Sequence, residues 1–102
     1  MNIIDTTTHQ RFFDVVASTD QSQAATMVLS PGQSTGGPKN VHKGSDQWLF
    51  VHAGSGVATI DGESHRIAAG DLVLIEPGEA HEIRNDGEEP LTTVNIYAPP
   101  EY

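Results

Sequence analysis

Apolar residues along this chain gather in short segments that are separated by glycine, proline and small polar residues. The segments recur about every 8–12 residues, and none keeps a 3.6-residue apolar period over a dozen positions. This pattern is typical of a β-sandwich or barrel with many short strands rather than of a helical protein. Eight strands are predicted, over residues 12–17, 24–29, 47–52, 57–60, 64–67, 72–75, 81–84 and 91–97.

The connections between these segments carry turn and loop chemistry. Asp61-Gly62 separates two segments and predicts a two-residue hairpin turn, whose central positions both need a positive φ. Residues 1–11 and the tail 99–102 look peripheral, since the first are polar and Pro99-Pro100 lacks the N–H groups that a ladder needs. We expect one domain, made of N-terminal strands with their leader (1–33), a barrel (34–98) and the tail (99–102).

Composition and charge narrow the possible partners. The chain has 102 residues, no cysteine and a formal net charge of -9. Such a field repels nucleic acid and anionic membranes, so we expect neither as a partner. The acidity could concentrate a divalent cation or could merely keep the protein in solution, and both interpretations stay open. Because the sequence shows no secretory leader and no apolar run of membrane-spanning length, we expect a cytoplasmic protein.

The most informative stretch is residues 70–85, GDLVLIEPGEAHEIRN. It resembles the second motif of the cupin superfamily, which reads Gly, five residues, Pro, one residue, Gly, two residues, His, three residues, Asn. Gly70, Gly78, His81 and Asn85 fall on that spacing, and Glu76 stands at the proline position. The stretch places an imidazole at the start of a strand, directly after a tight turn.

The first cupin motif is matched only in part. Counting back from Gly54, the motif's two histidine positions fall on Asn40 and His42, its glutamate position on Gln47 and its leading glycine on Ser34. The resemblance therefore covers roughly residues 34–98, and it implies an all-β fold. That fold is a cupin-type double-stranded β-helix, or jelly-roll barrel, in a single domain.

The resemblance implies one divalent transition metal ion (Zn, Ni, Fe or Mn) held by His42, Gln47, His81 and Asn40. His42 and Gln47 are five residues apart, so a bend within residues 43–45 is needed to bring both to one face. With two amides in place of a histidine and the glutamate, affinity should be lower by about one or two orders of magnitude. Asp46 could compensate in another register. The alternative is a polar cavity that holds water and no metal.

The alternation of side chains along a strand predicts which of the other residues face the inside of the barrel. If Gln47 points inward, then Leu49, Val51 and Ala53 do too, while Trp48, Phe50 and His52 face the other side. We expect a homodimer to cover that outer face, with an internal second layer as the alternative. His65 should reach solvent, and His9 lies in a leader with nothing to fix it. On the last strand, the face with Thr93, Asn95 and Tyr97 could be the pocket side or the solvent side.

Two functions fit this sequence better than a third possibility, a structural dimer with no binding site. The first is a metal-dependent enzyme, of isomerase, ring-opening or lyase type, that acts on a small oxygenated organic molecule in the barrel pocket. Its catalytic residues stay open, with Glu76, Glu79, Tyr97 and His52 as candidate general bases. The second is a non-catalytic cupin module that binds a small molecule or a metal, which the altered first motif favours.

Overall fold

The computed structural model describes residues 1–37 and 41–102, which form strands together with one short 3-10 turn, η1 (Thr6–Thr8). Each of the eight predicted strands is present, with ends that differ from the prediction by at most two residues. Their bounds are β1 Phe13–Ser18, β2 Gln23–Leu29, β3 Asp46–Ala53, β4 Ser55–Ile60, β5 Glu63–Ala68, β6 Leu72–Ile75, β7 His81–Arg84 and β8 Leu91–Ala98.

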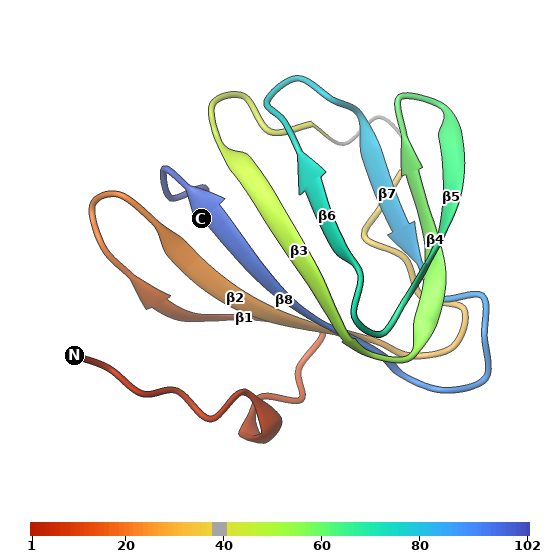
Figure 1. The fold of residues 1–102 in the computed structure, drawn as a ribbon, viewed down its shortest axis with the longest axis horizontal. Coiled ribbons are helices and arrows are strands. Elements are labelled where there is room, and N and C mark those ends of the chain that lie inside the picture. The colour runs from red at the N-terminus through yellow and green to blue at the C-terminus, as the bar shows by residue number, and fades with distance from the viewer. Residues whose placement is uncertain (38–40) are drawn as a thin grey trace.

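The strands form two antiparallel sheets that face each other (Figure 1). One sheet has five strands in the order β1-β2-β8-β3-β6, and the other has three in the order β5-β4-β7. Strands that are neighbours in a sheet are often far apart in sequence, as with β2 and β8. This is the predicted double-stranded β-helix, and the expectation of an all-β jelly-roll barrel is confirmed.

The alternation along β3 shows how the barrel sorts its side chains. Gln47, Leu49 and Val51 are buried, whereas Trp48 and Phe50 are exposed. The prediction for Ala53 is wrong, because the pairing of β3 with β8 shifts register between Val51 and Ala53 and leaves Ala53 exposed. A one-residue slip of this kind moves the following side chain to the other face.

The inside of the barrel is apolar at one end and polar at the other. The apolar end holds the hydrophobic core, which consists of Met27, Leu29, Leu49, Val51, Ala58, Ile67, Ile83 and Leu91. Because β3 and β8 run antiparallel, Val51 pairs with Thr93 near this core, while Gln47 pairs with Tyr97 at the opposite end. The polar side chains therefore gather at one mouth of the barrel, above a closed apolar floor.

Two turns show why particular residues are needed. Asp61 and Gly62 have φ of 48° and 83° and join β4 to β5, so the predicted hairpin turn is confirmed. Gly54 has φ of 85°, and a Cβ added there would collide with the carbonyl oxygen of Pro90. Glycine is thus required at position 54 both by backbone conformation and by the close approach of the loop before β8.

Asn85, the last residue of the second motif, ties loops together rather than facing the barrel mouth. It is fully buried, and its amide nitrogen donates to the carbonyl oxygens of Leu29 (2.9 Å) and Glu89 (2.7 Å). Its amide oxygen accepts from the backbone N–H of Gly87 at 2.9 Å. The motif position is therefore structural here.

The outer face of the five-stranded sheet carries an exposed apolar area, which we call the outer patch. Trp48 pairs across the strands with Leu74 and Ile96, and Phe50 pairs with Leu72, so their side chains share one face. The exposures of these five residues range from 37% to 59%. No second layer within the described residues covers them, and the predicted homodimer stays a prediction.

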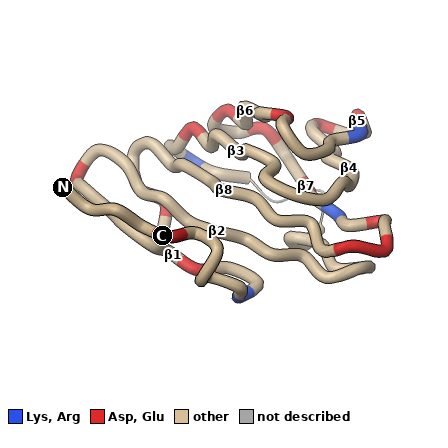
Figure 2. Tube along the Cα trace, turned by 60° about the horizontal axis from the view of Figure 1, so that its bottom comes forward, with Lys and Arg blue, Asp and Glu red and all other residues tan. Residues whose placement is uncertain are grey.

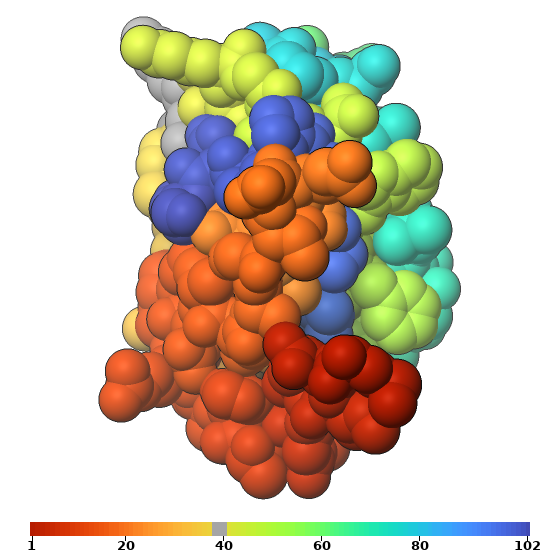
Figure 3. All heavy atoms as spheres, turned by 90° about the vertical axis from the view of Figure 1, so that its left-hand side faces the viewer, coloured from red at the N-terminus to blue at the C-terminus, as the bar shows by residue number. Residues whose placement is uncertain are grey.

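The leader lies at the foot of this sheet, beside β1, as Figure 3 shows in dark red. The expectation that nothing fixes His9 is wrong, since its Nδ1 lies 2.6 Å from Asp14 Oδ2 on β1.

Acidic residues are spread over loops and strand ends, with a run in the loop between β7 and β8 (Figure 2). Within residues 1–37 and 41–102, no helix is long and apolar enough to cross a membrane.

Candidate functional site

His42 lies in the loop before β3, and both its backbone and its ring are held. The bend at Lys43-Gly44 turns the chain so that His42 reaches the face that Gln47 occupies, as the sequence required. The carbonyl oxygen of His42 accepts from the N–H of Gly78 at 2.8 Å, which links the loop to the turn before β7. The side chain of His42 is 3% exposed, and its ring lies between two oxygen atoms.

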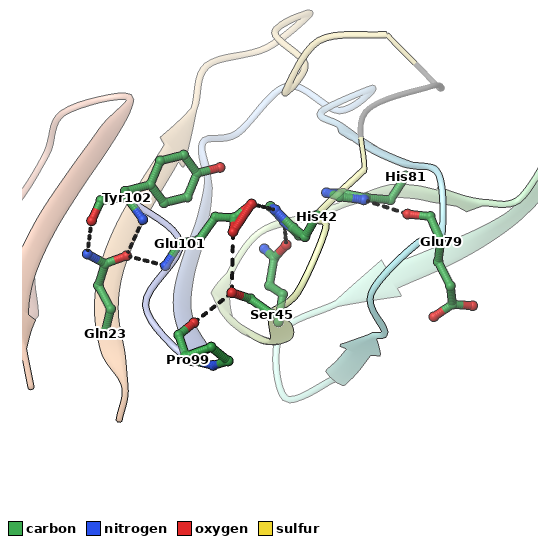
Figure 4. A network of polar contacts seen from close by, with 9 residues as sticks. Gln23, His42, Ser45, Glu79, His81, Pro99, Glu101 and Tyr102 are labelled. Atoms are coloured by element: carbon green, nitrogen blue, oxygen red, sulfur yellow. Dashed lines mark hydrogen bonds and ion pairs between the residues drawn. The ribbon is translucent and has the colours of Figure 1, made fainter. Parts of the chain in front are cut away.

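One of these oxygens belongs to Glu101, as Figure 4 shows, and the other belongs to Gln47. His42 Nδ1 lies 2.8 Å from Glu101 Oε1, and because a carboxylate only accepts, Nδ1 carries the proton. His42 Nε2 lies 2.7 Å from Gln47 Oε1. Both atoms have a lone pair, so they can either share a hydrogen bond or bind one cation together.

Gln47 is fixed from its other side by β8. Its amide nitrogen donates to Asn95 Oδ1 at 3.0 Å, and the Asn95 nitrogen donates to Thr93 Oγ1 at 3.0 Å. The face of β8 that carries these two residues and Tyr97 therefore points inward, which decides the alternative left by the sequence. Asp46 lies on the opposite face of β3, so the alternative register that would use it does not occur.

His81 begins β7 and faces the same space. Its Nδ1 lies 3.1 Å from the carbonyl oxygen of Glu79, so Nδ1 donates and Nε2 keeps its lone pair. Burial lowers the pKa of His81 below its ordinary value, and the nearby His42 acts in the same direction, against the opposing influence of Glu79. The ring is therefore neutral at pH 7, and its free nitrogen can accept a proton or bind a metal.

The rings of His42 and His81 lie with centroids 4.7 Å apart. Two imidazoles bound to one ion at right angles have centroids about 4.5 Å apart, given metal–nitrogen distances of about 2.0–2.1 Å. The structure thus brings together three of the residues assigned as ligands, from a loop, from β3 and from β7. The donor set of two imidazole nitrogens and one amide oxygen suits a transition metal ion.

Two features qualify the predicted ligand set. Asn40, the fourth predicted ligand, lies outside the described residues. In the part of the chain that the structure describes, no three His, Asp or Glu side chains are grouped closely enough to hold a metal. A metal site here would therefore depend on an amide oxygen as its third donor.

The tail is part of this site, contrary to the expectation that residues 99–102 are peripheral. Besides contacting His42, Glu101 accepts from Ser45 Oγ at 3.3 Å, and that hydroxyl also donates to the carbonyl oxygen of Pro99 at 2.7 Å. Gln23 on β2 holds the tail by its backbone, accepting from the N–H groups of Glu101 (3.2 Å) and Tyr102 (2.9 Å). No spacing rule in the sequence linked Glu101 to His42, since 59 residues separate them.

A cavity of about 260 Å³ opens above these polar groups. His42, Gln47 and His81 line its polar side, together with Thr35. Aromatic and aliphatic side chains form the remaining walls, and these are Phe12, Phe13, Met27, Ile83, Tyr97 and Tyr102. A cavity is therefore present at the mouth of the barrel, where the sequence predicted a ligand pocket.

The candidate bases differ in their access to this cavity. Tyr97 lines it, but burial raises the pKa of Tyr97 far above its ordinary value, and Tyr102 and Glu101 add to the shift, so the phenol keeps its proton. His52 is exposed on the outer side of β3, and Glu76 is exposed. The carboxylate of Glu79 accepts from the backbone N–H of Glu76 at 2.7 Å within the turn. His65 is exposed, as predicted.

Comparison with known proteins shows what the chain resembles. Residues 25–97 match the cupin domain family. The chain is 37% identical over 67 residues to an oxalate-binding protein of Thermotoga maritima, a match that covers 66% of this chain and 54% of that protein. It is 31% identical over 71 residues to the tetracenomycin polyketide synthase protein TcmJ of Streptomyces glaucescens, covering 70% of this chain and 46% of that protein.

The chain thus spans about half the length of these curated relatives. A solved structure from Klebsiella pneumoniae, described as an uncharacterized conserved protein with a double-stranded β-helix domain, superposes with a TM-score of 0.88. The two chains are 25% identical, and the superposition covers 97% of this chain and 90% of the other.

Proposed function

Because the chain belongs to the cupin family, we propose that it is a metal-binding cupin that acts as an enzyme on a small oxygenated organic molecule. The reaction type that we favour is isomerisation, ring opening or lyase chemistry. One observation carries the proposal. Both buried imidazoles hold an acceptor through Nδ1 and turn Nε2 toward a shared space that the Gln47 amide also faces.

His42, Gln47 and His81 would hold one divalent transition metal ion (Zn, Ni, Fe or Mn). When bound, the ion would act as a Lewis acid on a carbonyl or hydroxyl oxygen of the substrate. The fixed Nδ1–H of each ring supports this, because metal-binding histidines usually donate their other N–H to a carboxylate or a backbone carbonyl. Glu101 and Glu79 are such acceptors here.

The remaining residues would bind and orient the substrate. The Tyr97 phenol can donate a hydrogen bond to a substrate oxygen, since it keeps its proton. The aromatic walls would exclude water from the polar end, and exclusion of water strengthens each polar contact. One relative is named as an oxalate-binding protein, and oxalate is a small oxygenated molecule, which is compatible with the proposal.

A second candidate is a cupin module that binds a small molecule or a metal without turnover. The hydrogen bonds of Gln47 favour it, because that amide is engaged by both His42 and Asn95 and contributes no charge. A divalent ion held only by neutral donors keeps its full charge, so it should bind less tightly than an ion that also has a carboxylate ligand. The two candidates differ in one measurable respect, namely turnover of metal-loaded protein.

The test is the metal content of purified protein by plasma emission, followed by turnover on a panel of sugar acids and enolisable diketones, with and without chelator. We expect wild type and His65→Ala to retain metal and His81→Ala to lose it. Equal retention in both variants would refute the ligand assignment. Metal-loaded protein that leaves every substrate unchanged would favour the binding module.

A further inference from the structure

We propose that the cavity takes an acid that carries a flat ring, with two adjacent oxygens that chelate the metal ion while the ring lies against the aromatic walls. Aromatic 2-oxo and 2-hydroxy acids belong to this class. The inference rests on the proposed function, because it takes an ion on His42, Gln47 and His81 as its starting point. It adds the class of ligand that this ion and the cavity walls would select together.

The protein donors leave room on the ion for a ligand. The described donors are three, namely Nε2 of His42, Oε1 of Gln47 and Nε2 of His81. Transition metal ions in proteins take four to six ligands, so positions remain for oxygens of a bound molecule. A group with two adjacent oxygens fills two of these positions, and its second oxygen binds at a high effective concentration once the first is bound.

The charge at the polar end favours an acid once the ion is bound. None of the described residues that line the cavity is a lysine or an arginine. The ion would therefore supply the positive charge that an acid meets here, and Glu101, on the other side of the His42 ring, offsets part of it. The remaining excess suits a single acidic group, whereas the same group without the ion would be buried with no cationic partner.

The walls favour a ring. The chain has six aromatic side chains, and four of them line this cavity, namely Phe12, Phe13, Tyr97 and Tyr102. Tyr102 packs against Phe13 with ring centroids 4.8 Å apart, and against Tyr97 at 5.1 Å. Phe12 is nevertheless 45% exposed and Tyr102 is 62% exposed, so both keep ring surface that a flat ligand can cover.

Two of the wall residues are also held in place. The Gln23 amide accepts from the backbone N–H of Tyr102 at 2.9 Å and donates to its main-chain oxygen at 2.6 Å. Thr35 Oγ1 accepts from the N–H of Ile83 at 3.0 Å, so the proton of that hydroxyl is left to donate to a ligand oxygen. The cavity therefore offers a fixed ring and a free donor without rearrangement of the backbone.

The volume sets the size of the ligand. A dry apolar cavity of about 150 Å³ accommodates benzene. At about 260 Å³, this cavity has room for one ring with a short chelating group. Phenylglyoxylate and pyruvate are suitable probes, since both carry the same 2-oxo acid group and the same single charge at pH 7, while only phenylglyoxylate has a ring.

The experiment measures binding of the two acids to zinc-loaded protein by calorimetry, after plasma emission has established that zinc is bound. We expect phenylglyoxylate to bind at least about tenfold more tightly than pyruvate, the effect of covering one ring. In chelator-treated protein, phenylglyoxylate should bind at least about tenfold more weakly than in zinc-loaded protein, because the charge and the open coordination positions are gone.

Variants of the walls test where the ring lies. Phe12→Ala and Tyr102→Ala should each weaken phenylglyoxylate binding about three- to tenfold, the range for loss of an aromatic contact, without weakening pyruvate binding. Phe50→Ala is the matched control, since that side chain is 41% exposed but lies on the outer patch. We expect no change in the binding of either acid to this variant.

Equal binding of the two acids by zinc-loaded protein would overturn the inference, and so would phenylglyoxylate binding that is absent with zinc or equally tight without it. Equal effects of Phe12→Ala and Phe50→Ala would also overturn it, because binding would then not depend on the cavity wall. Protein that takes up no zinc would refute the proposed function and the inference with it, and plasma emission reports that outcome before either acid is added.

Discussion

Glu101 should act as a positioning residue that strengthens metal binding through His42. Its carboxylate lies 2.8 Å from His42 Nδ1, and its side chain is only 24% exposed, so solvent screens the contact weakly. A hydrogen bond to a charged group contributes about 1.5–3 kcal/mol, roughly twice the value for a neutral pair. Glu101→Gln keeps an acceptor and removes the charge, so it should cost about 1–1.5 kcal/mol, or about tenfold in Zn²⁺ affinity.

Glu101→Ala removes the acceptor altogether and should weaken Zn²⁺ binding up to about a hundredfold, the upper range for loss of such an outer contact. The assay is competition for Zn²⁺ against a chromophoric chelator. The tail should keep its place in both variants, because Gln23 binds it through the backbone of residues 101 and 102.

A matched control is available in Glu63→Gln. Glu63 also lies near a histidine, at 4.0 Å from His65, but its side chain is 84% exposed, and strand β4 lies between it and His81. We expect no change in Zn²⁺ affinity for this variant. Wild-type affinity in both Glu101 variants, with the fold intact by circular dichroism, would refute the positioning role.

Further predictions concern stability and assembly. Gly54→Ala should destabilise the fold by about 1–3 kcal/mol more than Gly32→Ala, because the two glycines share a φ of 85° but only the first is crowded by Pro90; equal melting temperatures would contradict this. In metal-free protein, the free energy of unfolding should be flat from pH 7 to about 9, below the ordinary tyrosine pKa of 10, and should fall as the pH drops through the ordinary histidine value of 6.5. The reason is that burial lowers the folded-state pKa of His81, which faces His42 and Glu79, so the unfolded chain takes up the proton first. Urea titrations at several pH values measure this free energy of unfolding. If it falls with decreasing pH as steeply in His81→Gln as in wild type, His81 is not the cause of the pH dependence. We also propose that two copies pair through the outer patch, so light scattering should give a dimer for wild type and a monomer for Phe50→Lys; a wild-type monomer at high concentration would exclude it.

Local patterns in the sequence were sufficient to predict the strands and the barrel. Alternation around Gln47 and the spacing of turn residues act over a few positions, and the second motif places His81 at a strand start by local rules alone. Even the approach of His42 to Gln47 followed from a bend that the intervening Lys43-Gly44-Ser45 allows.

The remainder of the site depends on contacts between distant segments. The sequence indicated that Pro99-Pro100 ends the last strand, and β8 does end at Ala98. It did not indicate where the chain goes next, because that path is decided by Gln23, on a strand far away in sequence. The inward orientation predicted for Ala53 was wrong for a related reason. The register shift near Ala53 arises from the pairing of β3 with β8, and the alternation of residues along β3 does not reveal it.

The hydrogen bonds between Gln23 and the tail mean that different parts of the polypeptide support folding and ligand binding. The strands support the fold, whereas the tail supports the site. Loss of residues 101 and 102 would take away a support of one imidazole and a wall of the cavity while leaving every barrel strand complete. Substitutions in this short segment could therefore tune affinity or ligand choice with little effect on thermal stability, which makes it a natural place to look for differences between related barrels.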